Sequence, residues 1–247
     1  MTRPVNTKQL RFYLTAPAPC PYLPGKRERK VFTALEGDDS YGLHDALTHA
    51  GFRRSQNIAY RPACEGCDAC VSARVPTQAF TWTRSRKKIL ARNDDLTRTF
   101  RKARATEEQY WLLRRYLDHR HAGGGMAEMT AFDYAAMVEE SAVATGVIEY
   151  RDAGGTLVAA ALVDMVSDGL SMVYSYFDPT DPSRSLGTFL ILDAIRQCAR
   201  AEVAFVYLGY WVRGSAKMDY KIRFQPLELL STAGWVDHAA WLASREG

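Results

Sequence analysis

The sequence predicts a mixed α/β (α+β) protein built from two parts of different local character. Residues 1–104 are irregular and rich in turn-forming residues, whereas residues 105–247 alternate helical and extended patterns. The first part holds 20 Lys and Arg against 9 Asp and Glu, and the second holds 12 against 19. We therefore expect a smaller basic α+β domain over 1–104, with a cysteine cluster, and a larger, more regular domain over 105–247.

The overall composition is that of an ordinary globular protein. Of the 247 residues, 47% are hydrophobic and 24% are charged, and no apolar run approaches the ~20 residues that cross a bilayer. The first residues, MTRPVNTKQLRFYL, lack the uninterrupted apolar core of a signal peptide. Five cysteines, four of them in the first 70 residues, do not resemble a secreted disulfide framework. We expect a protein of the reducing cytoplasm without a membrane partner.

Local signals define the elements of the first part. PAPCPYLPGK (17–26) is expected to be a loop, because proline and glycine interrupt regular structure. A short helix is expected within 40–55, ended by Gly51. A cysteine-bearing turn within 61–75 leads into a strand. Residues 84–104 contain nine basic residues and mix helical with extended preferences, so both structures remain open.

The second part has clearer periodicity. It begins with a helix over 105–122 that has a capping pattern at Thr106 and one apolar stripe. The stripe consists of Trp111, Leu112, Tyr116 and Leu117. The elements that follow are a helix over 130–142, strands over 147–151, 156–169 and 170–179, a helix over 185–201 and a strand over 205–212. Turn-forming residues between the first three strands predict an antiparallel meander.

The order of three strands, a helix and a strand resembles the core of the GNAT acyltransferases. In those enzymes the N-terminus of that helix, with unpaired amides and a positive dipole end, holds a pyrophosphate of acyl-CoA. The helix here begins with Arg184, Ser185, Leu186 and Gly187. Phe189 replaces the second glycine of the usual acyl-CoA pattern, and a plain helix cap by Ser185 is the alternative interpretation.

Four segments together resemble one family. They are CPYLPG (20–25), GFRRSQNIAYRPACEGCDAC (51–70), YFDPTDPSRSLGTFLILDAI (176–195) and YLGYWVRGSAKMDYKIRFQPLELL (207–230). They are similar to the arginyl-tRNA–protein transferase family, and in particular to its bacterial branch, the aspartate/glutamate leucyltransferases. The resemblance implies a GNAT-like C-terminal domain that carries an N-terminal domain. It also implies transfer of leucine, or alternatively arginine, from its tRNA to proteins with N-terminal Asp or Glu, which marks them for degradation in the N-degron pathway.

A tRNA partner suits the basic first part, because tRNA is a polyanion. The terminal phosphate of the aminoacyl-adenosine would lie at 184–187, where related enzymes hold CoA. Other phosphate contacts would position the tRNA without reading its sequence. The candidates are Arg84, Arg86, Lys87, Lys88, Arg92, Arg98, Arg101 and Lys102. An ordinary solvated charged surface is the alternative for this set.

The implied reaction is attack of an α-amine on an activated ester, so we expect direct transfer without a covalent enzyme intermediate. Asp178, at the end of the third strand, is the candidate general base. Tyr174, Tyr176 and Tyr210 are candidates to orient the ester or to pass the proton. The alternatives are that Asp178 caps the DPTDP turn and that the tyrosines belong to the core.

Selection of an N-terminal Asp or Glu requires a cation near the acceptor side chain, because a guanidinium or ammonium binds a carboxylate. The candidates are Arg53, Arg54, Arg61, Lys221 and Arg223. Arg61 and Lys221 are favoured because they lie inside family-like motifs. Structural salt bridges are the alternative role for all five.

Three cysteines in CxxCxxC spacing, with a fourth earlier in the chain, could supply thiolates to zinc or to an iron–sulfur cluster. They are Cys20, Cys64, Cys67 and Cys70. No cofactor is required for the chemistry itself, and thiols that pack a turn without metal are the alternative. Cys198 is expected to lie in the core. The histidines His44, His49, His119 and His121 have no ligand spacing.

Two other functions fit parts of the sequence. The first is an acyl-CoA-dependent N-acyltransferase of the GNAT type, which the missing second glycine and the basic first part disfavour. The second is a non-catalytic RNA-binding module with an inert acyltransferase domain. Neither interpretation, nor the transferase, calls for a DNA partner.

Overall fold

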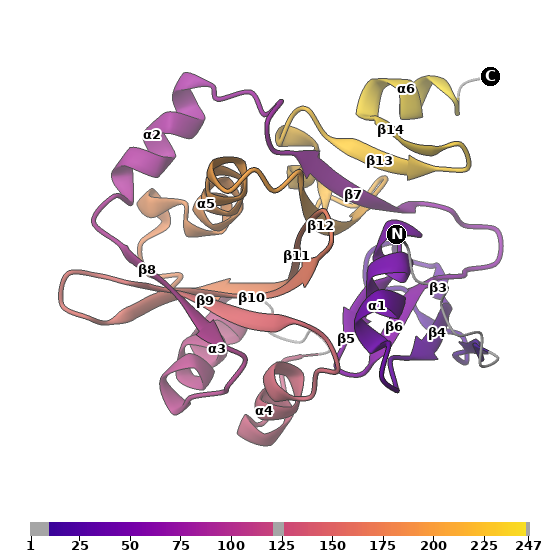
Figure 1. The fold of residues 1–247 in the computed structure, drawn as a ribbon, viewed down its shortest axis with the longest axis horizontal. Helices are drawn as coiled ribbons and strands as arrows, with labels where there is room; N and C mark the ends of the chain where they lie inside the picture. The colour runs from indigo at the N-terminus through magenta and orange to yellow at the C-terminus, as the bar shows by residue number, and fades with distance from the viewer. Residues whose placement is uncertain (1–9, 121–125, 246–247) are drawn as a thin grey trace.

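The computed structural model describes residues 10–120 and 126–245, and it is organised around one large mixed sheet (Figure 1). This sheet has eight strands, and β11 and β12 are a parallel pair within it. In spatial order the strands are β14 (Gly234–Asp237), β13 (Glu228–Ser231), β7 (Cys70–Pro76), β12 (Phe205–Val212), β11 (Gly169–Phe177), β10 (Leu157–Val166), β9 (Thr145–Arg151) and β8 (Thr97–Lys102).

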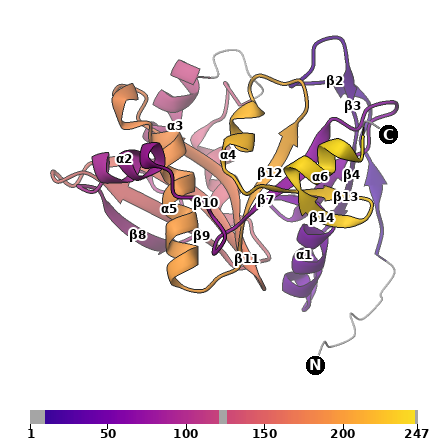
Figure 2. The same cartoon turned by 90° about the horizontal axis from the view of Figure 1, so that it is seen from above.

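Helices cover both faces of the large sheet. α2 (Arg84–Arg92) and α5 (Leu186–Arg200) share one hydrophobic core with β7 and β12, and they lie side by side in Figure 2. α3 (Glu107–Arg120) and α4 (Ala131–Glu139) form a second core on the opposite face. No helix among the described residues is long and apolar enough to cross a membrane.

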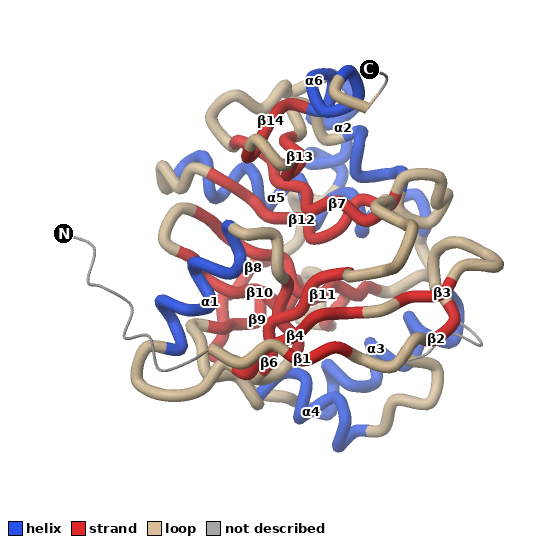
Figure 3. Tube along the Cα trace, turned by 90° about the vertical axis from the view of Figure 1, so that its right-hand side faces the viewer, coloured by secondary structure: helices blue, strands red, loops and turns tan. Residues whose placement is uncertain are grey.

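A small lobe packs beside the large sheet (Figure 3). Its own four-stranded sheet and one helix enclose a separate small core. The elements are β1 (Tyr13–Leu14), β4 (Lys30–Ala34), β6 (Ile58–Pro62), β5 (Arg53–Ser55) and α1 (Ser40–His49). β2 (Ala18–Pro19) and β3 (Arg27–Glu28) form a two-stranded ribbon. Two 3₁₀ helices (Pro182–Arg184 and Asp219–Arg223) and α6 (His238–Ala243) complete the described elements.

The central strands β11 and β12 separate soon after they meet. They pair only from Gly169 to Ser171 on β11 and from Phe205 to Tyr207 on β12. Beyond that point β11 continues to pair with β10, and β12 continues to pair with β7. From Met172 on β11 and from Leu208 on β12, the two strands therefore no longer pair with each other. We call the region between these two diverging segments the split.

The structure confirms the predicted α+β class, the antiparallel meander β9–β10–β11, the helix after it and the following buried strand, in a GNAT-like order. The segment 84–104, left open by its composition, forms α2 and β8. The predicted apolar stripe of α3 is wrong at Trp111, which is 58% exposed, because Leu113 faces the core instead. The end of that helix beyond residue 120 lies outside the described residues.

The large sheet does not divide at residue 104. β7 and β8 precede that residue, yet both pair within the eight-stranded sheet. The last strand of the four-stranded sheet, β6, ends at Pro62, and the first strand of the eight-stranded sheet, β7, begins at Cys70. A domain boundary at 104 stays a prediction, and it does not coincide with a boundary between sheets.

Candidate active site

Arg53, from β5 of the small lobe, reaches into the split. Its Nη2 donates to the carbonyl oxygen of Val173 at 2.6 Å and to that of Met172 at 3.3 Å. Both carbonyls belong to β11 just beyond its last pair with β12. Arg53 therefore donates to backbone acceptors of β11 beyond the point where β12 pairs with that strand.

Gly209 makes room for the Arg53 guanidinium on the β12 side of the split. Its φ is +69°, and the pairing of β12 with β7 shifts register there. A Cβ at this position would lie 1.4 Å from Arg53 Nη1. A glycine inside a buried strand often marks a close approach of this kind. The sequence signal for this feature was therefore present in FVYLGYWV, although the expectations above did not use it.

Lys221 brings a second basic side chain to the same region. It belongs to the 3₁₀ helix Asp219–Arg223, is 3% exposed, and donates from Nζ to the carbonyl oxygen of Tyr210 at 2.5 Å. Burial holds the pKa of Lys221 well below its usual value, and the nearby Arg53 lowers that pKa further. Across residues 10–120 and 126–245, no carboxylate forms an ion pair with Arg53 or Lys221.

Aromatic side chains lie between these cations and the start of α5. Tyr220 is close enough to Arg53 and Tyr116 to interact electrostatically with both. The ring of Tyr116 packs against that of Phe177, with centroids 5.0 Å apart. Phe177 in turn covers Gly187, where a Cβ would lie 2.9 Å from its ring. The split and the N-terminus of α5 are thus linked by one aromatic wall.

The N-terminus of α5 is held in place by Arg184. Its guanidinium binds both carboxylate oxygens of Asp95, at 2.9 and 2.7 Å. Ser185 adopts a left-handed conformation, with φ of +53°, and its side chain makes no capping hydrogen bond. Among the described residues, the backbone amides of Leu186 and Gly187 have no backbone acceptor. These amides are free to bind an anion.

Comparison with known proteins decides the family. Residues 18–88 match the description "Arginine-tRNA-protein transferase, N terminus", and residues 108–231 match "Arginine-tRNA-protein transferase, C terminus". The chain is 62% identical to the aspartate/glutamate leucyltransferase of Phenylobacterium zucineum, over 95% of this chain and 93% of that protein. The chain belongs to the arginine-tRNA–protein transferase family.

Two further likenesses extend this result. The aspartate/glutamate leucyltransferase of Parvibaculum lavamentivorans is 58% identical, over 97% of this chain and 100% of that protein. The solved structure of L-PGS from Bacillus licheniformis has a TM-score of 0.50 at 12% identity, covering 64% of this chain and 57% of that one. The second likeness concerns the fold alone, and the first confirms the resemblance drawn from the four sequence segments.

The catalytic candidates of this transferase lie in different environments. The Tyr176 hydroxyl is 2.6 Å from that of Tyr134, and Tyr176 is only 1% exposed. The Tyr210 hydroxyl lies 3.0 Å from the carbonyl oxygens of Gly51 and Tyr60. Both hydroxyls are engaged by protein groups, although Arg53 is near enough to the Tyr210 hydroxyl to affect its pKa, so a catalytic role for either tyrosine stays a prediction. The core alternative applies to them, because their hydroxyls are hydrogen-bonded inside the protein.

Tyr174 and Asp178 remain near the end of β11. Tyr174 is half-buried, and burial raises its pKa, so its hydroxyl stays protonated and can donate a hydrogen bond. Asp178 accepts a hydrogen bond from the amide of Thr180 at 3.0 Å and lies 3.4 Å from Arg115 Nη2. The first contact is the turn cap described as the alternative, and the ion pair with Arg115 engages the Asp178 carboxylate as well.

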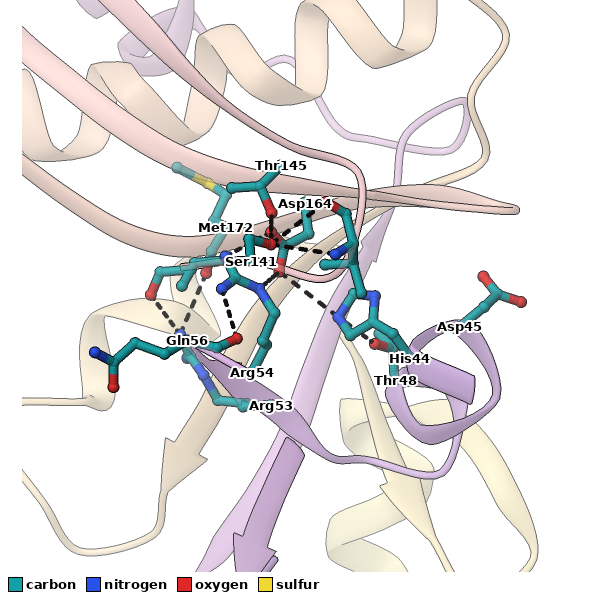
Figure 4. A network of polar contacts seen from close by, with 12 residues as sticks. His44, Asp45, Thr48, Arg53, Arg54, Gln56, Ser141, Thr145, Asp164 and Met172 are labelled. Atoms are coloured by element: carbon teal, nitrogen blue, oxygen red, sulfur yellow. Dashed lines mark hydrogen bonds and ion pairs between the residues drawn. The ribbon is translucent and has the colours of Figure 1, made fainter. Parts of the chain in front are cut away.

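Arg54 does not belong to the acceptor site, although it follows Arg53 directly. Its guanidinium binds Asp164 through two hydrogen bonds of 2.7 and 2.8 Å, and both side chains are fully buried (Figure 4). Thr145 donates to the same carboxylate at 2.7 Å. His44 Nε2 lies 3.6 Å from it, and burial lowers the pKa of His44. The salt-bridge alternative applies to Arg54.

The other acceptor candidates lie outside the split. Arg61 is exposed and stacks on Phe52, with its guanidinium 5.1 Å from the ring centre. Arg223 is exposed, and its carbonyl oxygen accepts a hydrogen bond from Arg86. The structure therefore brings together Arg53 and Lys221 alone among the five predicted cations.

The candidate phosphate contacts also divide into two groups. Arg86, Arg92, Arg98 and Arg101 already bind protein groups. Exposed cations without a partner in the described part of the chain are Arg84, Lys87, Lys88 and Lys102. Three of these project from α2, which packs beside α5. A role for this exposed face of α2 in binding RNA stays a prediction.

The four N-terminal cysteines line one cavity of about 430 Å³ between the ribbon β2–β3 and the small sheet. Burial, together with the charges of the other three thiols, raises the pKa of Cys70 to about 12. No three Cys, His, Asp or Glu side chains in the described chain are arranged to hold a metal ion. The thiols as placed do not fit a metal centre, so a metal here stays a prediction, to be checked by metal analysis after purification without oxygen.

The fifth cysteine and the histidines named in the sequence analysis remain to be placed. Cys198 belongs to α5 and lies in the core with 7% of its surface exposed, as predicted. His49 lies 3.0 Å from Asp168, and His119 is exposed. His121 lies outside the described residues.

Proposed function

We propose that the protein transfers leucine from leucyl-tRNA to the α-amine of proteins with N-terminal Asp or Glu. The observation that carries this proposal is the identity of 62% with an aspartate/glutamate leucyltransferase over nearly the whole of both chains. The open anion-binding end of α5 and the cationic split are consistent with the two substrates. The proposal places the enzyme in the cytoplasm, where charged tRNA is found, and its products in the N-degron pathway.

Catalysis in this proposal is positioning rather than covalent chemistry. The α-amine of the acceptor, with a reference pKa of about 8, is partly neutral at physiological pH. It attacks the ester carbonyl carbon, the new C–N bond forms, and the ester C–O bond breaks. The terminal ribose hydroxyl of the tRNA leaves with the proton that the amine releases. Holding the two groups in register can lower the barrier by about 7–11 kcal/mol.

The donor end would lie along the aromatic wall. A terminal phosphate would bind the free amides of Leu186 and Gly187, which the structure leaves without backbone acceptors. Arg120, whose guanidinium lies 5.4 Å above the Phe177 ring, adds positive charge beside that point. Tyr174 would donate a hydrogen bond toward the ester carbonyl. The body of the tRNA would then follow the exposed face of α2.

A transfer assay tests the proposal. Leucyl-, phenylalanyl- and arginyl-tRNA are offered in parallel with acetyl-CoA to peptides that begin with Asp, Glu or Ala. We expect leucine to be incorporated into the Asp- and Glu-ended peptides only. Acetylation from acetyl-CoA would support the acyl-CoA-dependent alternative, and tight tRNA binding without any transfer would support the RNA-binding module.

Removal of three charges from α2 should weaken tRNA binding. The variant Arg84→Gln/Lys87→Gln/Lys88→Gln loses three exposed cations, and each phosphate contact contributes about 0.7–0.9 to the slope of log affinity against log salt. We expect the slope to become shallower by about 2–3. Fluorescence anisotropy with labelled tRNA at several salt concentrations measures it. Lys217→Gln, which removes one exposed charge outside α2, is the control, and an unchanged slope in the triple variant would exclude α2 from the tRNA site.

A further inference from the structure

A groove of about 410 Å³ lies between α2 and α5. The residues that line it are Trp82, Lys87, Leu90, Arg196, Ala199 and Arg200. Half of them are apolar and half are basic, and none of the described residues of this lining is acidic. The cysteine-lined cavity differs in this respect, because its lining includes Glu28 and Asp68. The groove therefore combines an apolar surface with positive charge alone.

Trp82 gives the groove an aromatic surface that the core holds in place. This half-buried residue comes just before Thr83, the N-cap of α2. Its ring meets the ring of Phe80 edge to face, with centroids 4.8 Å apart, and Phe80 is itself 5% exposed in the core. An aromatic side chain beside positive charge is the usual surface on which an unpaired base stacks.

Two of the three basic residues of the groove are available to a ligand. The side chains of Lys87 and Arg200 are exposed, and neither has an ion pair or a hydrogen bond with another described residue. Arg196 differs from them, because its Nη2 lies 2.7 Å from the buried carboxylate of Asp193. A phosphate group can therefore approach Lys87 and Arg200 without breaking an ion pair within the described protein.

We propose that this groove binds an unpaired nucleotide of the donor tRNA, an inference that rests on the proposed transfer from tRNA. The base stacks on Trp82, and the flanking phosphates meet Lys87 and Arg200. Arg196 lies ten residues after Leu186 on α5, so the groove is about 15 Å along that helix from its start. The nucleotide held here therefore lies on the same helix as the place proposed for the terminal phosphate.

An unpaired nucleotide suits the groove better than a protein segment or an RNA duplex. The buried centres of protein interfaces are depleted of charged residues, and of lysine in particular, whereas this apolar surface lies beside Lys87 and Arg200. Bases within an RNA duplex are stacked on each other and cannot stack on a side chain. A duplex held by its phosphates alone and a segment of the acceptor protein are the competing occupants.

The first test compares a labelled single-stranded oligoribonucleotide with the duplex of the same sequence, by fluorescence anisotropy. Trp82→Leu keeps an apolar side chain and removes the aromatic surface. We expect its affinity for the single strand to fall about 5- to 150-fold, the value of one stacked base, and its affinity for the duplex to stay unchanged. Trp82→Phe should retain most of the affinity. Trp111→Leu, which changes a 58% exposed tryptophan on α3, is the control and should alter neither affinity.

The salt dependence of single-strand binding separates stacking from phosphate contact. Arg200→Gln should make the slope of log affinity against log salt shallower by about 0.7, because one phosphate contact is lost. Trp82→Leu should leave the slope unchanged, since stacking releases no counter-ion. Because Arg200 is exposed, its variant tests the groove even where a Trp82 variant is unstable, and an unchanged slope in Arg200→Gln would contradict the inference.

Leucine transfer completes the experiment. Trp82→Leu and Arg200→Gln should raise the KM for leucyl-tRNA and leave the KM for an Asp-ended peptide unchanged. If the wild type binds the single strand through Trp82 but transfers no leucine, the proposed function fails and this inference stands. If Trp82→Leu weakens single strand and duplex equally, changes neither, or raises the KM for the peptide instead, the nucleotide groove is overturned.

Discussion

The Asp164→Ala variant is expected to lose about 3–5 kcal/mol of unfolding free energy, the usual result of breaking a buried ion pair. Arg54 would keep its charge with 0% of its side chain exposed and without the carboxylate that accepts its two hydrogen bonds. Thr145 would lose its acceptor as well. Because β5 and β10 belong to different sheets, the loss should also loosen the small lobe. Guanidinium denaturation followed by circular dichroism measures the change.

The double variant Arg54→Met/Asp164→Leu is the matched control. It removes both charges together and leaves apolar side chains of similar size, a change that is often neutral or stabilising. We expect its unfolding free energy to lie within about 1 kcal/mol of the wild type, since the charges cost free energy to bury. If Asp164→Ala proves as stable as the wild type, the pair does not hold the small lobe to the large sheet.

The Gly209→Ala variant is expected to lose transfer activity by about 100-fold, because a displacement of about 1 Å at a positioning group has an effect of that size. The new Cβ would lie only 1.4 Å from the position of Arg53 Nη1, so it would displace the guanidinium from the split. The carbonyls of Met172 and Val173 would then lose their donor. Initial rates of leucine transfer to an Asp-ended peptide measure the loss.

Gly214→Ala separates this steric effect from backbone strain. Gly214 also has a positive φ, +79°, but a Cβ there would meet only Leu23 at the ordinary distance of 3.8 Å. Both variants carry the cost of a left-handed alanine, about 1–2 kcal/mol. We expect Gly214→Ala to retain transfer activity at a temperature where it is folded. Equal activity losses in the two variants would show that strain, and not the displaced Arg53, is responsible.

The sequence was most informative where local patterns decide the structure. The meander, the helix that follows it and the strand containing Gly209 all have periodicities that a short window reveals. The role of Gly209 in that strand, which is to leave room for Arg53, depends on a residue from another part of the chain. A glycine in a strand pattern indicates that some group comes close, but the pattern does not identify the group.

Arg53 and Arg54 show why the site itself could not be completed from the sequence. Successive residues of a strand point to opposite faces, so adjacent arginines must have different surroundings. Which of them meets a carboxylate depends on Asp164, 110 positions later in the chain. The same limit applies to Tyr176, whose place on β11 was predicted but whose hydrogen bond to Tyr134 depends on the packing of α4. Residue type suggested the candidates, and long-range packing selected among them.

The insertion of β7 between β12 and β13 means that the two halves of this protein cannot be treated as separable modules. A chain cut at residue 104 would remove β7 from one side of β12 and β8 from the outer edge of β9, exposing unpaired backbone on the remaining fragment. The start of α5 and the split would lose their shared scaffold together. Fusion of two independent units at residue 104 is therefore a poor description of this architecture, because strands from both sides of that residue share a single interwoven sheet.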